Sequence, residues 1–206
     1  MGTLYIPRIR VTADGADVRV SAPYNPHWPP LARSLGGQWN TRIRVWHFDL
    51  RDLGRVRDAL IKVYGWDGTY PVEILDARLL LDGFDLGRTN AFWMFGRLIV
   101  ERLFRDAPAR LGPGVILVRG GFPASGGSRK HPSIDPDPGT ELEVRDVFAA
   151  IFAARKERWP QNITEVPGSR RIIPGPGGEA VHTGAPRATG QPRRRIILEE
   201  KLEGRS

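Results

Sequence analysis

The chain has 206 residues, enough for one or two small domains, and its 31 basic against 23 acidic side chains give a formal net charge of +8. A basic excess of this size favours nucleic acid or another polyanion as a partner, although it says nothing about the fold. There are no cysteines, which excludes disulfides, thiolate zinc sites and cysteine nucleophiles. The N-terminal segment has no apolar region typical of a secretory signal, and no apolar run approaches a membrane span, so we expect a cytoplasmic protein without membrane partners.

The first 70 residues carry 10 basic and 6 acidic side chains and have regular hydrophobic patterns. Alternation of apolar and polar residues predicts strands, and apolar residues at helical spacing predict amphipathic helices. In chain order we expect two strands joined by a hairpin turn, a short helix stopped by two glycines, a hairpin or bent strand, and a longer helix: residues 4–11, 17–21, 25–35, 38–48 and 50–64. Residues 1–70 are therefore predicted to form a small βαβα module.

Residues 71–159 are nearly neutral, with 13 basic and 12 acidic side chains, and short apolar runs separated by turns predict a mainly β domain. The stretch 90–104 fits a helix by its length and by Asn90 as a cap. It fits two strands, with Gly96 as a bend, by its aromatic and β-branched content, and we favour the strands. Asp146 is predicted to cap one C-terminal helix, Val147 to Trp159, which Pro160 ends.

Residues 160–206 are rich in proline and glycine and carry 8 basic and 5 acidic side chains. This composition cannot build a core, so we expect a disordered basic tail. Its last part, RRRIILEEKLEG, either contacts a partner or nucleic acid after the arginine triplet, or has no role. The whole chain is thus predicted to be an α+β protein with a first module over 1–70, a β-rich domain over 71–159 and a tail.

The first module resembles a known family. A strand ending near APYNP, a short helix, GGQW, then VWHF and a helix ending in VYG are similar to the HARP (HepA-related protein) domain, which occurs beside the motors of annealing helicases and alone in bacterial mobile-element proteins. The resemblance covers about residues 8–68 and implies binding of single-stranded or forked DNA. The chain has no helicase motor, so ATP-driven rewinding is not implied. The matching positions are Tyr24, Gly37, Trp39, Trp46, Phe48 and Tyr64.

Two tryptophans seven residues apart, Trp39 and Trp46, are either core residues or a surface for stacking bases. Alternate residues of a strand share a face, so Trp46 and Phe48 point the same way. A module of about 60 residues needs large side chains to make a core. We therefore assign Trp46 and Phe48 to the core and leave both interpretations open for Trp39, beside the turn.

The arginines of the predicted strands alternate with aliphatic residues and therefore lie on the solvent side. If the strands are neighbours, these side chains form one basic patch that can follow phosphates, and the strands hold few acidic partners. The alternative is an ordinary solvated charged face. We favour the patch and place nucleic-acid contacts at Arg8, Arg10, Arg19, Trp39, Arg42 and Arg44.

The segment GGFPASGGSRK, residues 120–130, follows a predicted strand and resembles a phosphate-binding P-loop. Gly127 stands where the P-loop lysine would reach the phosphates, and Pro132 opposes a following helix, so we exclude a nucleoside-triphosphatase site. The loop is either a mobile surface loop or a place where backbone amides, with Arg129 and Lys130, bind a phosphate of nucleic acid.

No other pattern indicates catalysis, a metal or a cofactor. The histidines are isolated, and Asp135 and Asp137 lie in a proline turn as solvated turn formers. We therefore predict a protein that is not an enzyme and that binds single-stranded or forked DNA, or RNA, as an accessory factor in replication, repair or a mobile-element system. The alternative function is that of a protein-interaction subunit or inhibitor in a larger nucleoprotein complex.

Overall fold

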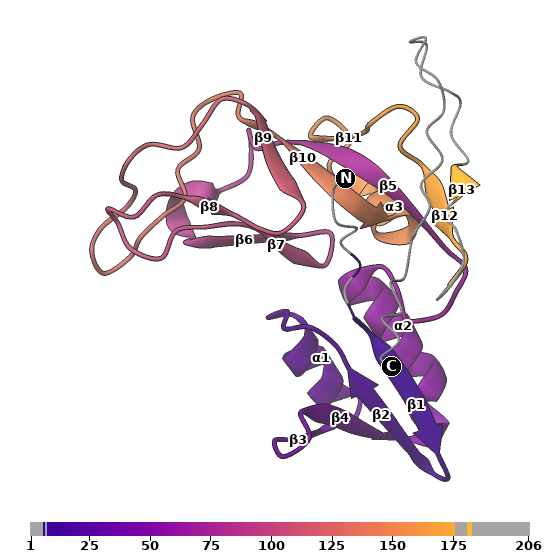
Figure 1. Cartoon of the computed structure of the whole chain (residues 1–206). Helices are drawn as coiled ribbons and strands as arrows, with labels where there is room; N and C mark the ends of the chain where they lie inside the picture. Colours follow the sequence, from indigo (N-terminus) through magenta and orange to yellow (C-terminus); the bar gives the residue numbers. More distant parts are fainter. Residues whose placement is uncertain (1–5, 7, 176–180, 183–206) are drawn as a thin grey trace, which may run out of the picture.

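The structure of the chain is a computed structural model that describes residues 6, 8–175 and 181–182. Within these residues it contains three α-helices and three antiparallel sheets, which confirms the mixed α+β class. Figure 1 shows the N-terminal sheet with two of the helices in the lower half, and the other two sheets with the third helix in the upper half.

The lower half is a four-stranded sheet of order β1-β2-β4-β3 with helices packed on one face. Val18 and Val20 alternate with exposed residues along β2 and are fully buried, because every second residue of a strand faces the core. Gly65 ends the longer helix in the left-handed conformation, with φ of 81°. The elements are β1 (Arg10–Asp14), β2 (Asp17–Ser21), α1 (Trp28–Ser34), β3 (Gln38–Asn40), β4 (Val45–Asp49), the 3₁₀ turn η1 (Leu50–Asp52) and α2 (Leu53–Tyr64).

The upper half is built on β5, which pairs with β10, β11 and β12 in a six-stranded sheet; β13 and β9 extend it at its two ends. A smaller three-stranded sheet has the order β6-β7-β8. The elements are β5 (Val72–Leu80), η2 (Leu86–Arg88), β6 (Ala91–Met94), β7 (Arg97–Glu101), β8 (Arg110–Leu111), β9 (Val115–Arg119), β10 (Glu141–Phe148), α3 (Ala149–Arg158), β11 (Ile163–Glu165), β12 (Arg171–Ile173) and β13 (Val181–His182).

The stretch 90–104 confirms the strand prediction, since β6 and β7 form a hairpin that turns at Phe95 and Gly96. Gly96 has φ of 78°, and a Cβ there would lie 2.7 Å from the Cα of Tyr64. Glycine is therefore required both by the backbone conformation and by the close approach of α2.

Two sequence predictions in the C-terminal third are wrong. Asp146 does not cap the last helix: it lies within β10, at a bulge with φ of 55°, and its carboxylate is paired with Arg171. The predicted disorder after Pro160 is wrong for residues 161–173, because β11 and β12 pair with β5, which supplies the hydrogen bonds that this segment could not make alone. The segment RRRIILEEKLEG lies outside the described residues.

One continuous cluster of buried side chains joins the two halves. The rings of Trp66 and Phe148 stack with centroids 5.3 Å apart, which places the segment just after α2 against the last residue of β10. The buried Asn25 donates from Nδ2 to the carbonyl of Gly96 at 3.1 Å, so a polar contact also crosses between the halves. No helix among the described residues has the length and apolar character needed to cross a membrane.

Candidate nucleic-acid interface

The two tryptophans have different environments. Trp46 and Phe48 are buried in the core of the N-terminal sheet, as predicted, with Trp46 only 5% exposed. Trp39 lies opposite Trp46 on the edge strand β3 and is 45% exposed, with the two ring centroids 5.4 Å apart. Trp46 thus contributes to the core, while Trp39 presents part of its ring to solvent.

The unpaired arginines of the N-terminal sheet lie at one of its ends. Arg10 begins β1, and Arg42 and Arg44 lie in the turn between β3 and β4. The pairings Arg10–Ser21, Val20–Trp46 and Asn40–Val45 place the start of β1 and this turn at the same end of the sheet. We call this surface the basic end and define it by Arg8, Arg10, Arg42 and Arg44.

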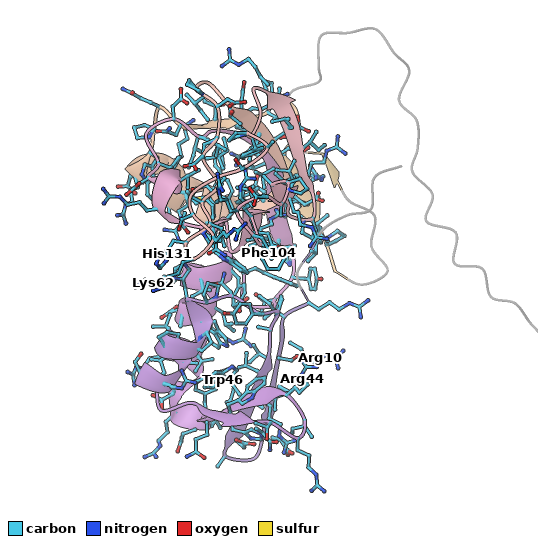
Figure 2. The ribbon with its side chains drawn as sticks, turned by 90° about the vertical axis from the view of Figure 1, so that its left-hand side faces the viewer. Arg10, Arg44, Trp46, Lys62, Phe104 and His131 are labelled. Carbon is cyan, nitrogen blue, oxygen red and sulfur yellow. The ribbon has the colours of Figure 1, made fainter. Side chains whose placement is uncertain are left out.

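All four arginines of the basic end are exposed, and no acidic side chain of the described residues forms an ion pair with them. The turn that carries Arg42 and Arg44 is held by Asn40, whose Oδ1 accepts hydrogen bonds from the backbone N–H groups of Arg42 at 3.0 Å and Ile43 at 3.3 Å. Figure 2 shows Arg10 and Arg44 on the same side of the molecule. The guanidinium groups are therefore free to contact an anion.

The opposite end of the same sheet carries Asp14, Asp17 and Asp49, and we call it the acidic end. Arg19 belongs to this end. Its guanidinium lies 3.4 Å from Asp14 and 3.2 Å from Asp17, so the expectation that these strands lack acidic partners does not hold for Arg19. His47 Nδ1 also lies 2.9 Å from Asp17 Oδ2. The contact with His47, followed by that with Arg19, lowers the pKa of Asp17 below its ordinary value.

Asp49 at the acidic end is paired as well. Arg51 donates to it from the side chain and from the backbone, and these hydrogen bonds lower the pKa of Asp49 to about 2. The outer surface of the sheet is thus divided into one end where arginines are neutralised by carboxylates and one where they are not.

A shallow hollow of about 570 Å³ lies on this face beside Trp39. Besides Trp39 it is lined by amide, hydroxyl, imidazole and carboxylate groups: those of Gln38, Asn40, Thr41, His47 and Asp17. Amides and hydroxyls both donate and accept hydrogen bonds, so they suit the edges of bases and sugars. The hollow adds hydrogen-bonding groups beside the strand that carries Trp39.

In the segment 120–130, which we call the glycine loop, three successive backbone N–H groups are not free to bind a phosphate. The N–H of Gly126 donates to the Arg105 carbonyl at 2.9 Å, that of Gly127 to Asp135 Oδ2 at 3.1 Å, and that of Ser128 to the His131 carbonyl at 2.9 Å. Because these donors are already used, the P-loop-like phosphate cradle is not formed.

The fully buried Arg102 stabilises this loop from inside by donating to the carbonyls of Pro123 at 2.8 Å and Ile134 at 3.2 Å. Arg129 and Lys130 are exposed at the loop tip, next to His131. In Figure 2, His131 lies on the opposite side from Arg10 and Arg44. Arg129 and Lys130 are therefore not brought together with the basic end.

A second candidate binding site was not predicted from the sequence. Aromatic side chains and two cations line a groove between the halves. These residues lie on α2, on β6, on the segment that follows β5, and on α3 and the residue after it. No local pattern signals such a site, because its residues are close only in the folded chain.

The chain matches no protein-family model, no curated protein and no solved structure. Among the described residues, no group of three or more His, Asp or Glu side chains is arranged to hold a metal ion.

Proposed function

We propose that this protein binds single-stranded or forked nucleic acid through the basic end, without catalysing a reaction on it. The observation that carries the proposal is the set of exposed arginines without acidic partners at one end of the N-terminal sheet. Arginine donates in a planar fork that matches phosphate oxygens, and every phosphate contact releases counterions from the nucleic acid. Such a surface gains affinity for a polyanion without first breaking an ion pair of its own.

Trp39 supports a single-stranded ligand rather than a duplex. Stacking of an unpaired base on an exposed aromatic ring contributes about 1–3 kcal/mol, whereas the bases of a duplex are already stacked on each other. Trp39 is held against Trp46 and lies in the strand just before the turn that carries Arg42 and Arg44. An aromatic ring beside cations is the combination that binds single strands without sequence preference.

We further propose that residues 8–68 are a HARP-like module and that the protein acts in the cytoplasm as an accessory factor in replication, repair or a mobile-element system. The matching residues divide into core and surface positions. A Cβ at Gly37 would lie 2.5 Å from the ring of Phe48, so glycine is needed there for packing, while Tyr24 and Trp39 remain exposed. The other matching residues build the core: Trp46, Phe48 and Tyr64.

The test is fluorescence anisotropy with short labelled oligonucleotides: single-stranded DNA, forked DNA, duplex DNA and single-stranded RNA. We expect the tightest binding to the single-stranded and forked forms. The double variant R42Q/R44Q should weaken binding by roughly a hundredfold, because it removes two charged contacts that each contribute about tenfold. The control R51Q removes a positive charge from the acidic end, where Asp49 already pairs with Arg51, and should leave affinity nearly unchanged. Equal losses from both variants, or no binding to any form, would overturn the proposal and favour the protein-interaction function.

A further inference from the structure

A groove of about 670 Å³ lies between the two halves. One wall comes from α1 and α2, and the other from β6, the segment after β5 and the end of α3. Lys62, which lines the groove, lies on the side opposite to Arg10 and Arg44 in Figure 2, so the groove is separate from the basic end. Its volume lies within the range of about 300–1,000 Å³ that is usual for small-molecule sites.

Half-buried aromatic rings form the apolar part of this groove. Phe84 lies between two other rings, with centroid distances of 5.1 Å to Phe92 and 5.5 Å to Trp159. Trp93 adds a fourth ring from the strand that carries Phe92. These side chains are partly exposed in the groove rather than sealed in the core, so a flat apolar or aromatic group can still cover them.

The charged residues that line the groove are cations, Lys62 from α2 and Arg155 from α3, and no acidic side chain of the described residues lines it. Neither cation has an ion-pair partner among the described residues. Burial, together with the nearby positive charge of Arg158, lowers the pKa of Arg155 below its ordinary value. A half-buried guanidinium that lacks a carboxylate is stabilised when an anion binds next to it.

We infer that this groove binds a nucleotide, with the base against the aromatic rings and the phosphate at Lys62 and Arg155. The nucleotide is either free or the terminal residue of a bound strand, since both present the same ring and phosphate. For the strand, the inference rests on the proposed function of the basic end; for a free nucleotide it does not.

The first experiment is isothermal titration calorimetry of the full chain with AMP, adenosine and inorganic phosphate. AMP should bind more tightly than either fragment, because only AMP contacts both the rings and the cations. R155Q and K62Q should each weaken AMP binding on the order of tenfold, which corresponds to the loss of one charge-assisted hydrogen bond. Lys62 is exposed, so K62Q keeps the test valid if R155Q fails to fold.

The matched control is K156Q, which removes a positive charge from α3 at an exposed residue outside the groove. It should leave AMP binding unchanged. The inference is overturned if AMP does not bind, if phosphate binds as tightly as AMP, or if K156Q weakens binding as much as R155Q.

The second experiment separates the two sources of the nucleotide by comparing oligonucleotides with a 5′-phosphate and with a 5′-hydroxyl in an anisotropy assay. Recognition of a strand end predicts tighter binding of the phosphorylated strand, and R155Q should abolish that difference while R42Q/R44Q weakens both strands equally. If AMP binds but the two strands bind alike, the ligand is the free nucleotide. Loss of strand binding in R42Q/R44Q without any AMP binding would refute the groove and leave the proposed function intact. If AMP binds but R42Q/R44Q does not weaken strand binding, the basic end is refuted and the groove is supported.

Discussion

The basic end of the N-terminal sheet and the six-stranded sheet use arginine in opposite ways. On strands β5, β10 and β12 of the six-stranded sheet the arginines are paired: Arg78 lies 3.0 Å and Arg145 3.2 Å from Glu143, and Arg171 contacts both Asp76 and Asp146. At the basic end the arginines have no such partners among the described residues. Net charge does not distinguish these two situations, so a candidate nucleic-acid surface is better identified from ion pairing than from composition.

The tryptophans divide in the same way. Trp46 is buried in the core, whereas Trp39 on the neighbouring strand is nearly half exposed. The paired arginines and the buried tryptophan should therefore affect stability, and the unpaired arginines and the exposed tryptophan should affect binding.

The largest effect is expected from W46A. Removing a large buried aromatic side chain leaves a cavity and should lower the free energy of unfolding by about 3–5 kcal/mol. W39A removes a partly exposed ring and should cost less stability, while weakening single-strand binding by about 1–3 kcal/mol through lost base stacking. Urea unfolding and anisotropy measure the two effects. The division fails if W46A keeps its stability but loses binding.

Arg171 tests the paired arginines. Its side chain is 13% exposed and faces Asp146, which is 6% exposed, so R171M leaves a buried carboxylate without this partner. Breaking a buried ion pair from one side costs about 3–5 kcal/mol. R10M at the basic end should change the free energy of unfolding by no more than about 0.5 kcal/mol, as is usual for surface substitutions. Chemical denaturation of both variants checks this, and similar losses would show that pairing does not separate the two groups.

A smaller effect, on salt dependence, is expected from the basic end itself. Each phosphate contact on a single strand adds about 0.7 to the slope of log affinity against log salt concentration. R42Q/R44Q should therefore lower that slope by about 1 to 1.5 and weaken binding to all sequences alike, because phosphates carry no base information. Anisotropy at several salt concentrations measures the slope, which R51Q should not change. An unchanged slope in R42Q/R44Q would mean that these side chains do not contact phosphate.

The smallest effect concerns acid stability. The pKa of Asp49 is about 2 in the folded protein, against an ordinary value of 3.8. Because the folded value is depressed, the stabilisation by Asp49 is fully present above about pH 4 and is lost as the pH falls toward 2. The melting temperature should change little between pH 7 and 5 and fall below pH 4, with a shallower fall in D49N. A fall in the melting temperature between pH 7 and 5 would show that a group other than Asp49 causes the loss of stability.

Much of the N-terminal module follows from its sequence, because strand alternation and helical spacing are local signals. They correctly place Trp46 and Phe48 in the core. Outside this module, the aromatic and β-branched content of residues 90–104 correctly predicts the β6–β7 hairpin with its turn at Gly96. The ion pairs of Arg19 were also within reach, since Asp14 and Asp17 flank the same hairpin turn.

Other features depend on distant parts of the chain. Strands β11 and β12 have three residues each and pair with β5, about 90 residues earlier in the chain. Because this pairing partner is distant, the local composition of the segment indicates disorder although the segment forms strands. Asp146 shows the same limitation, because its carboxylate pairs with Arg171 instead of capping a helix. The aromatic groove is likewise assembled from segments that no local pattern relates.

The central claim is that single strands bind at the basic end, and photo-crosslinking tests it most directly. A single strand that contains 5-iodouracil is crosslinked to the full chain, which is then digested with trypsin, and the modified peptides are identified by mass spectrometry. We predict the main crosslink at Trp39, within the tryptic peptide of residues 34–42, and its loss in W39A. Crosslinks confined to the glycine loop around Arg129 and Lys130, or to residues beyond 175, would contradict the account.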